Sequence, residues 1–161
     1  MRIIGIDPGL NVTGYGVVDI EDDCCRHVAH GVVRTRPSDP LATRLVAIRD
    51  GVVAAARHWQ AGAAAVEASF VGENARSALA LGQARAAAIL GMADCGLTVH
   101  EYTPAVVKQT VAGYGRGEKP QVAEMVRLQL GMKATPSPVD AADALAVAIT
   151  HWAHSRLAAR G

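Results

Sequence analysis

The chain has 161 residues, of which 50% are hydrophobic and 19% are charged, so it can bury the core of one domain and is too apolar to be intrinsically disordered. Its formal net charge is only +1, which excludes binding to nucleic acid by overall charge and leaves only a local patch of basic side chains. Three cysteines, two of them adjacent, exclude a disulfide framework, and no spacing of Cys and His residues indicates a zinc site.

The first part of the chain is typical of β structure. Two apolar runs, Ile3–Ile6 and Thr13–Asp19, are separated by Pro8 and Gly9, which indicates a hairpin. Arg26–Thr35 predicts a third strand, so we expect an antiparallel meander of three strands.

A long helix is predicted next, over Pro40–Gln60. Asp39 is a suitable N-cap, with Pro40 at the first helical position. The apolar residues that recur at helical spacing are Leu41, Leu45, Ile48 and Val52.

Strands and helices alternate in the rest of the chain. The predicted elements are a buried strand that runs into a loop over Ala63–Phe70, a helix at Asn74–Cys95, a strand at Leu97–Tyr102, and helices at 103–111, at 120–130 and from Ser137 or Pro138 to about His154. We expect an α/β fold in which a mixed sheet is flanked by helices, with right-handed parallel crossovers after residue 60, all in a single domain over residues 1–161.

No segment of the sequence is typical of export or of membrane insertion. Asp7 and Pro8 interrupt any apolar core of a signal peptide. The most apolar long stretch, residues 75–93, contains Arg76, Gln83 and Arg85, which argues against a membrane span. The sequence therefore predicts a soluble, cytoplasmic protein.

Four carboxylates fall where a site would form. Asp7 ends the first strand, and Glu67 lies near the end of the strand that follows the first helix. Because sites in α/β sheets gather at the carboxyl ends of parallel strands, these two side chains are expected side by side if their strands are neighbours. Asp140 and Asp143 are three residues apart, so they share one face of the last helix and its first turn can bring them to the same place.

These four acids predict a metal site. Carboxylates that converge in a partly buried site repel one another unless divalent cations lie between them. Hard oxygen ligands suit Mg²⁺ or Mn²⁺, and two such ions about 3.5–4 Å apart are a common arrangement for phosphodiester hydrolysis.

Structural roles are the alternative for each acid. Asp7 precedes Pro8 and is suited to capping a turn, and Asp140 is suited to stabilising a helix N-terminus. Glu67 follows a buried strand and needs a partner there, whereas Asp143 lies among apolar residues. It is the conjunction of the four that favours a catalytic site.

Four sequence blocks resemble the RuvC family of Holliday-junction resolvases: "GIDPGLNVTGYGVV", "VEASFVGENARSALALGQARAAA", "PAVVKQTVAGYGRGEKPQVAEMV" and "DAADALAVAITH". Their order and separation also fit, and the resemblance spans almost the whole chain. It implies an RNase H-like fold, a homodimer, and Mg²⁺-dependent paired nicking of four-way DNA junctions in recombination and repair. With two metal ions activating water, we expect such nicks to leave 5′-phosphate and 3′-hydroxyl ends. It further implies the RuvA–RuvB branch-migration complex as a partner and a catalytic, metal-binding role for Asp7, Glu67, Asp140 and Asp143.

The resemblance also implies DNA contacts. Lys108 and Lys119 match basic residues near the family's site, and Phe70 matches an aromatic residue that stacks on bases at the junction centre. A core position for Phe70 and solvated charges for the lysines are the structural alternatives. The other candidate DNA-binding residues are Arg76, Gln83 and Arg116, in a region, Phe70–Thr135, where seven Lys or Arg residues outnumber five acidic ones.

Small residues on the Asn74–Cys95 helix suggest close packing against another helix. Ala78, Gly82 and Ala86 share one face, and the family's dimer uses this helix, so they are the predicted dimer interface. Packing onto the chain's own sheet is the alternative.

Three other functions remain open from the residues alone. The first block also resembles the phosphate loop of actin-like and sugar-kinase ATPases, although the second lobe and second Asp-Gly loop of those proteins are missing from these 161 residues. A catalytically silent nucleic-acid-binding relative is the second alternative, but such a protein would be expected to lack some of the four acids. A nuclease for another structured nucleic acid, such as RNA, is a third, smaller alternative.

Overall fold

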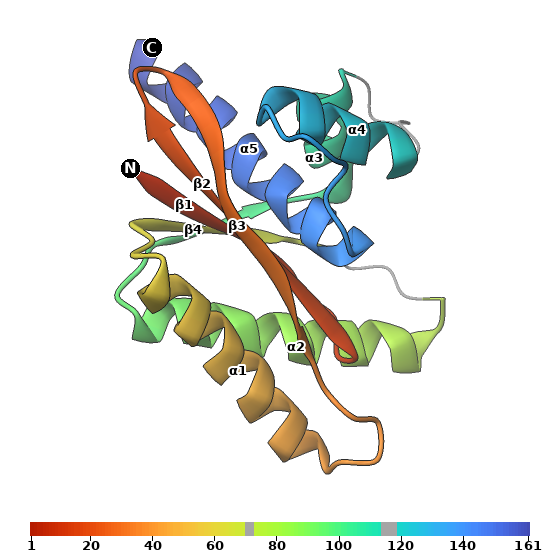
Figure 1. The fold of residues 1–161 in the computed structure, drawn as a ribbon. Coiled ribbons are helices and arrows are strands. Elements are labelled where there is room, and N and C mark those ends of the chain that lie inside the picture. Colours follow the sequence, from red (N-terminus) through yellow and green to blue (C-terminus); the bar gives the residue numbers. More distant parts are fainter. Residues whose placement is uncertain (70–72, 114–118) are drawn as a thin grey trace.

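A five-stranded mixed sheet forms the centre of the molecule, with helices on both faces (Figure 1). The computed structural model describes residues 1–69, 73–113 and 119–161, with the side chains of residues 119 and 120 left out. The strand order is β3-β2-β1-β4-β5, as expected for a meander extended by parallel strands. The strands are β1 (Arg2–Asp7), β2 (Val12–Glu21), β3 (Cys24–Arg34), β4 (Ala63–Glu67) and β5 (Val99–Tyr102).

The register of the sheet agrees with the predicted topology. β1 pairs antiparallel with β2, which pairs antiparallel with β3, whereas β4 runs parallel to both β1 and β5. β1 is therefore the strand where the antiparallel and parallel halves meet. Because β4 is its direct neighbour, the condition for bringing the ends of these two strands together is met.

One face of the sheet is covered by α1 (Leu41–His58) and α2 (Ala75–Asp94), which lie together below it in Figure 1. Ile4, Ile6 and Val66 point to this side and pack in one core cluster with Ile48 of α1 and Met92 of α2. The alternation along β1 and β4 therefore directs their other side chains to the opposite face.

The opposite face is covered by α5 (Val139–Arg160), with α3 (Pro104–Ala112) and α4 (Lys119–Gln129) packed against it. Helix α5 lies directly on β1 and β2, because three glycines of these strands leave it room. A Cβ atom at Gly5 would lie 2.6 Å from the backbone nitrogen of Ala148, and one at Gly16 would lie 2.6 Å from Cγ of Leu145. At Gly14 it would collide with the backbone of α5 at Asp140.

The helix boundaries test the predicted caps. Asn74 caps α2 by accepting a hydrogen bond from the backbone N–H of Ser77 at 2.9 Å, and Gly96, with φ of 73°, follows the helix in the left-handed conformation. Thr103 caps α3 in the same way, with Pro104 at its first position. The prediction that Asp39 caps the first helix is wrong: Pro40 is the N-cap residue, and the Asp39 carboxylate instead accepts a hydrogen bond from Arg36.

Other boundaries differ modestly. The strand predicted to run into a loop within residues 63–70 ends at Glu67, and the last helix continues six residues beyond His154, to Arg160. Its extra turns are held by ion pairs from Arg156 and Arg160 to Asp23 at the β2–β3 turn. Within the described part of the chain, no helix combines the length and the apolar character that crossing a membrane requires.

Candidate active site

Two of the predicted acids end neighbouring parallel strands. Asp7 is the last residue of β1 and Glu67 is the last residue of β4, and the register pairs the residues just before them, Ile6 and Val66. Both side chains are half-buried. They alternate with Ile6 and Val66, which point to the α1–α2 side, so the carboxylates point toward the layer of α5.

The other two acids are on the first turns of α5, above the same edge. The backbone oxygen of Asp140 lies over Gly14, and Gly14 is the cross-strand partner of Asp7. Asp143 follows one turn later on the same helix face and is half-buried, like Asp140. The close approach of α5 to the sheet therefore brings Asp140 and Asp143 over the end of β1.

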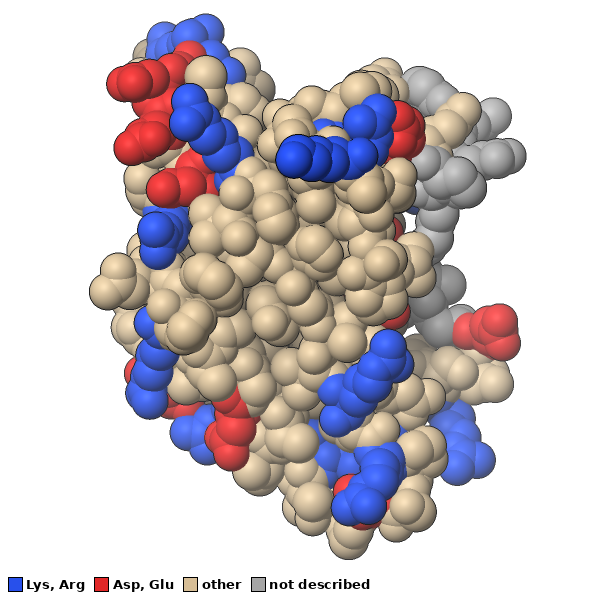
Figure 2. Space-filling model, viewed as in Figure 1, with Lys and Arg blue, Asp and Glu red and all other residues tan. Residues whose placement is uncertain are grey.

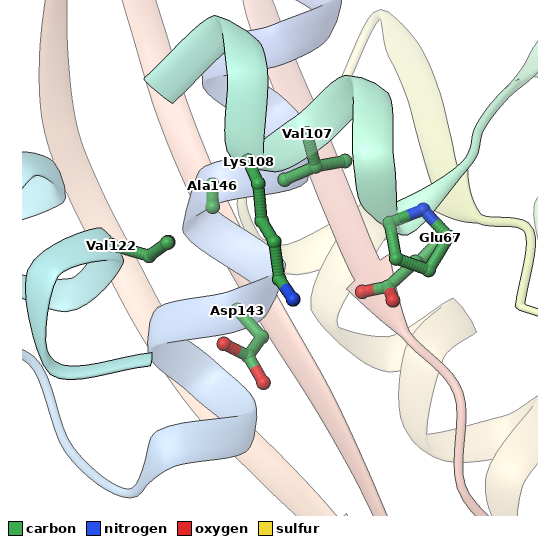
Figure 3. Close-up of a pocket in the computed structure, with 7 residues that line it drawn as sticks. Glu67, Val107, Lys108, Val122, Asp143 and Ala146 are labelled. Carbon is green, nitrogen blue, oxygen red and sulfur yellow. The ribbon is translucent and has the colours of Figure 1, made fainter. Parts of the chain in front are cut away.

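A pocket of about 120 Å³ opens beside these residues. Glu67 and Asp143 line it together with Lys108 of α3, and Figure 3 shows their two carboxylates and the Lys108 amine directed into one space. Apolar side chains from three helices, including Val107, Val122 and Ala146, form the rest of the wall. The pocket thus combines two acidic groups and one basic group with an apolar wall.

The donor set fits divalent metal ions of the hard class. All four acids offer carboxylate oxygens, and neither sulfur nor imidazole ligands are among them. In the described residues, however, no three His, Cys, Asp or Glu side chains lie close enough together to hold a metal ion as they stand. The structure brings the acids to one edge in pairs, and their joint role as ligands stays a prediction.

The predicted DNA-binding residues lie at different places, and only some of them are among the described residues. Lys108 lies in the pocket, and Arg76 is exposed near the start of α2. Phe70 and Arg116 lie outside the described residues, and at Lys119 the structure describes only the backbone, at the start of α4.

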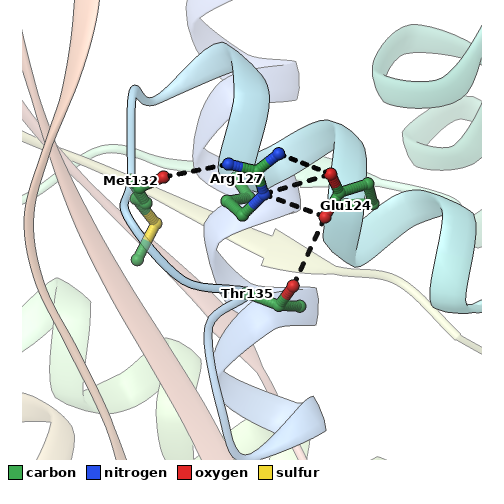
Figure 4. Close-up of polar contacts among 4 residues, drawn as sticks. All are labelled: Glu124, Arg127, Met132 and Thr135. Atoms are coloured by element: carbon green, nitrogen blue, oxygen red, sulfur yellow. Dashed lines mark hydrogen bonds and ion pairs between the residues drawn. The ribbon is translucent and has the colours of Figure 1, made fainter.

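Part of the predicted excess of basic residues is engaged within the chain. Arg85 forms an ion pair with Glu101. Arg127 binds both carboxylate oxygens of Glu124, with the shortest contact 2.6 Å, and also donates to the carbonyl of Met132 (Figure 4). These bonds hold the pKa of Glu124 below its ordinary value and fix the segment that leads from α4 into α5.

Basic side chains do not form a continuous patch on the face seen in Figure 2. Lys and Arg residues stand singly or beside acidic residues around its rim, and the middle of the face is uncharged. The face that Figure 2 shows therefore offers no continuous basic surface to DNA.

One of the three predicted dimer residues, Ala86, lines an apolar groove between α1 and α2. Gly82 and Ala86 are exposed and Ala78 is half-buried. The groove has a volume of about 260 Å³ and is lined by Leu45, Val46, Arg49, Gln83, Ala86, Ala87 and Leu90. Gln83, predicted to contact DNA, thus lines this groove and is absent from the lining of the carboxylate pocket.

A cluster of histidines between β5 and α5, formed by His100, His151 and His154, was not predicted. His151 of α5 is 6% exposed, stacks on His100 of β5 with ring centroids 4.2 Å apart, and shares a 2.8 Å hydrogen bond with the hydroxyl of Tyr102. Tyr102 is the register partner of Glu67. The signal in the sequence is only the alternation of His100 and Tyr102 on one strand, which by itself does not indicate a buried contact with a helix 49 residues away.

This cluster predicts a loss of stability in mild acid. Burial, together with the charges of His100 and His154, lowers the pKa of His151 to about 4, whereas an unfolded histidine titrates near 6.5. Between pH 6.5 and about pH 4, His151 is protonated in the unfolded chain but stays neutral in the folded chain. Because the unfolded state binds more protons, the free energy of unfolding falls as the pH is lowered through this interval. We expect a fall of about 1–3 kcal/mol, measured by urea unfolding at several pH values.

The control for this measurement is a pair of variants. His151→Gln should lose most of the pH dependence in this interval, while His58→Gln, at the exposed end of α1, should keep it. An unchanged slope in His151→Gln would mean that other groups dominate the titration.

Comparisons with known proteins agree with this arrangement. Residues 3–151 match the family model described as "Crossover junction endodeoxyribonuclease RuvC". The chain belongs to the RuvC family. A RuvC protein of Burkholderia ambifaria is 52% identical over 155 residues, which cover 96% of this chain and 83% of that protein. One of Chloroflexus aggregans is 47% identical over 151 residues, covering 94% and 92%.

A solved RuvC structure extends the likeness to three dimensions. RuvC of Thermus thermophilus, in complex with a Holliday junction substrate, superposes with a TM-score of 0.91 at 36% identity and covers 98% of this chain and 96% of its own. The chain therefore has the RNase H-like fold that its sequence predicts. As a RuvC family member it is a crossover junction endodeoxyribonuclease, and the family match leaves the ATPase alternative without support.

Proposed function

We propose that this chain resolves four-way DNA junctions by paired, symmetric nicks, as one nuclease domain over residues 1–161. The proposal is supported by the places of the four acids in the fold. Asp7 and Glu67 end adjacent strands, and Asp140 and Asp143 lie on the first turns of the helix that packs on these strands. A relative of the same fold, RuvC of Thermus thermophilus, has been solved with a Holliday junction substrate, which supports the choice of DNA substrate.

The four carboxylates would hold two Mg²⁺ ions, for which Mn²⁺ can substitute. When bound, such ions supply activation of the attacking water and stabilisation of charge on the leaving oxygen, giving 5′-phosphate and 3′-hydroxyl ends. The apolar wall formed by Val107, Val122 and Ala146 limits water around the pocket and strengthens electrostatic contacts inside it.

Lys108 would offset the charge of the scissile phosphate. Its amine is directed into the pocket that Glu67 and Asp143 line, which is where the phosphate must lie if the carboxylates act on it. Lys119, Arg116 and Phe70 are proposed to contact the junction as well, as the family resemblance implies. The RuvA–RuvB complex is proposed as a partner on the same ground.

The deciding experiment compares substrates. Purified protein is incubated with a synthetic four-way junction and with a linear duplex of the same sequence, each with and without Mg²⁺. We expect nicks at symmetric positions in two opposed strands of the junction, only with Mg²⁺, and little cutting of the duplex. Equal cutting of both substrates would contradict the proposal, and faster cutting of an RNA junction would favour another nuclease function.

A homodimer would place two such sites on a two-fold symmetric junction. The stripe of α2 that contains Gly82 and Ala86 also exposes Leu79 and Leu90, whose exposed fractions are 62% and 59%. Together with the groove against α1, this is the kind of apolar surface that monomers rarely leave open to water. We propose that a second copy of the chain covers it.

A charge in this groove should separate the protomers. We expect Leu90→Glu to weaken dimerisation by at least about 100-fold, because an unpaired charge would be buried in the interface. Sedimentation velocity gives the solution mass, and Leu157→Glu, at a leucine of α5 that is 70% exposed, is the matched control. A wild-type chain that sediments as a monomer, or a Leu90→Glu variant that stays dimeric, would contradict this interface.

A further inference from the structure

The turn that follows Asp7 is held by a buried arginine. Residues 8–11 connect β1 to β2, so their position determines where the end of β1 lies. Arg44 lies near the start of α1 and is only 9% exposed. Its side chain contacts the segment that connects β1 to β2. A guanidinium is costly to bury, so its contacts at this place require an explanation.

Three hydrogen bonds direct the Arg44 guanidinium onto the turn and onto the residue that closes it. Nη2 donates to the side-chain oxygen of Asn11 at 2.5 Å and to the carbonyl of Leu10 at 3.4 Å, while Nε donates to Oγ1 of Thr35 at 2.9 Å. All three acceptors are neutral oxygens. These bonds therefore fix the position of the turn, and none of them pairs the guanidinium with a carboxylate.

Thr35 completes this side of the turn. Its hydroxyl donates to the Leu10 carbonyl at 2.5 Å, and its backbone N–H donates to the Asn11 carbonyl at 3.0 Å. The Leu10 carbonyl thus accepts from both Thr35 and Arg44. The segment after β3, the turn after β1 and helix α1 are joined in one network.

A second hydroxyl holds the opposite side. Oγ1 of Thr13, which is fully buried, donates to the carbonyl of Gly9 at 2.7 Å and accepts from its backbone N–H at 3.2 Å. The turn is therefore bound at Gly9 by Thr13 and at Leu10 and Asn11 by Arg44 and Thr35, which are two, three and four residues after Asp7.

We infer that Arg44 is a positioning residue for the metal-binding edge: by fixing Leu10 and Asn11, it holds the end of β1 and thereby the Asp7 carboxylate in place. The inference rests on the proposed function only in taking Asp7 as a metal ligand. Removing the guanidinium while keeping an apolar side chain of similar length would leave α1 packed but remove two of the hydrogen bonds that hold the turn. Groups that orient a ligand in this way commonly change metal affinity or activity by about 10–100-fold.

The test uses the full chain with Arg44→Met, and with Arg57→Met as a matched control on the exposed side of α1. Mn²⁺ binding to the free protein is measured by calorimetry, junction binding by fluorescence anisotropy without metal, and cleavage across a Mg²⁺ titration. For Arg44→Met we expect Mn²⁺ binding about 10-fold weaker or more, and a higher Mg²⁺ requirement, with junction affinity within about 2-fold of wild type. Arg57→Met should match wild type in all three.

Two further variants separate positioning from folding. Thr35→Val and Asn11→Ala each remove one acceptor of Arg44 and should weaken Mn²⁺ binding in the same direction, non-additively with Arg44→Met. A loss of melting temperature with unchanged Mn²⁺ affinity in all three variants would overturn the inference and make the network purely structural. If wild-type protein fails to cut the junction but Arg44→Met still weakens Mn²⁺ binding, the inference stands and the proposed function fails.

Discussion

We expect the Asp7→Asn variant to lose at least about 100-fold in the rate of junction cleavage while binding the junction almost as tightly as the wild-type chain. Even groups that only orient a ligand cost up to about 100-fold in metal affinity or activity when they are changed, so loss of a direct ligand should cost at least as much. Asparagine has nearly the same shape as aspartate but carries no charge, so the substitution removes the anionic ligand with little change in volume.

The position of Asp7 makes the two effects separable. It is the last residue of β1, half-buried, and its backbone is held by pairing with Gly14. On either side of this edge, Ile6 of β1 and Val66 of β4 are buried in the apolar core, which the substitution leaves unchanged. Junction binding depends mainly on phosphate contacts from basic residues, which this substitution leaves in place.

The measurement is a single-turnover cleavage rate in Mg²⁺ beside junction binding in its absence. Asp50→Asn, on the exposed face of α1, is the matched control and should behave as wild type. If Asp7→Asn lost junction binding and melted at a clearly lower temperature, Asp7 would be a structural turn residue, the alternative that its place before Pro8 allows.

The positions of the four carboxylates in the fold could be predicted because the sequence pattern indicates where strands and helices begin and end. Asp7 and Glu67 each follow an apolar run, and parallel strands place their carboxyl ends at one edge, so the prediction needed only that β1 and β4 be neighbours. Asp140 and Asp143 needed only helical spacing. The spacing of residues in the sequence could not predict how closely α5 packs on the sheet. That distance depends on close contacts between α5 and three glycines of β1 and β2.

Arg44 was missed because its residue type contradicts its position. The spacing of Leu41, Leu45, Ile48 and Val52 places Leu41 on the buried face, yet Leu41 is 42% exposed and Arg44 is buried. Arg44 precedes Ile48 and Val52 by four and eight residues, so it continues the same stripe. A charged residue in an apolar stripe needs hydrogen-bond partners when it is buried. Only the structure identifies the turn that accepts the hydrogen bonds of Arg44.

A methyl group at Gly14 should damage both stability and catalysis. We expect Gly14→Ala to lower the free energy of unfolding by about 1–3 kcal/mol and to slow junction cleavage by about 100-fold. Its Cβ would collide with the backbone oxygen and carbon of Asp140 and lie 2.9 Å from the backbone nitrogen of Ala141. These are helix backbone atoms, which cannot rotate aside as the end of a flexible side chain can.

The strain at Gly14 can be relieved only by moving β2 or the first turn of α5, and α5 carries Asp140 and Asp143. A displacement near 1 Å in a catalytic group is enough for a rate loss of about 100-fold, even in a chain that remains folded. Urea unfolding and single-turnover cleavage are the two measurements. Gly62→Ala is the control, since its Cβ would meet no atom nearer than 3.7 Å. Wild-type stability and activity in Gly14→Ala would mean that α5 does not lie on β2 as closely as the structure has it. The proposal that the four acids act together would then lose its structural support.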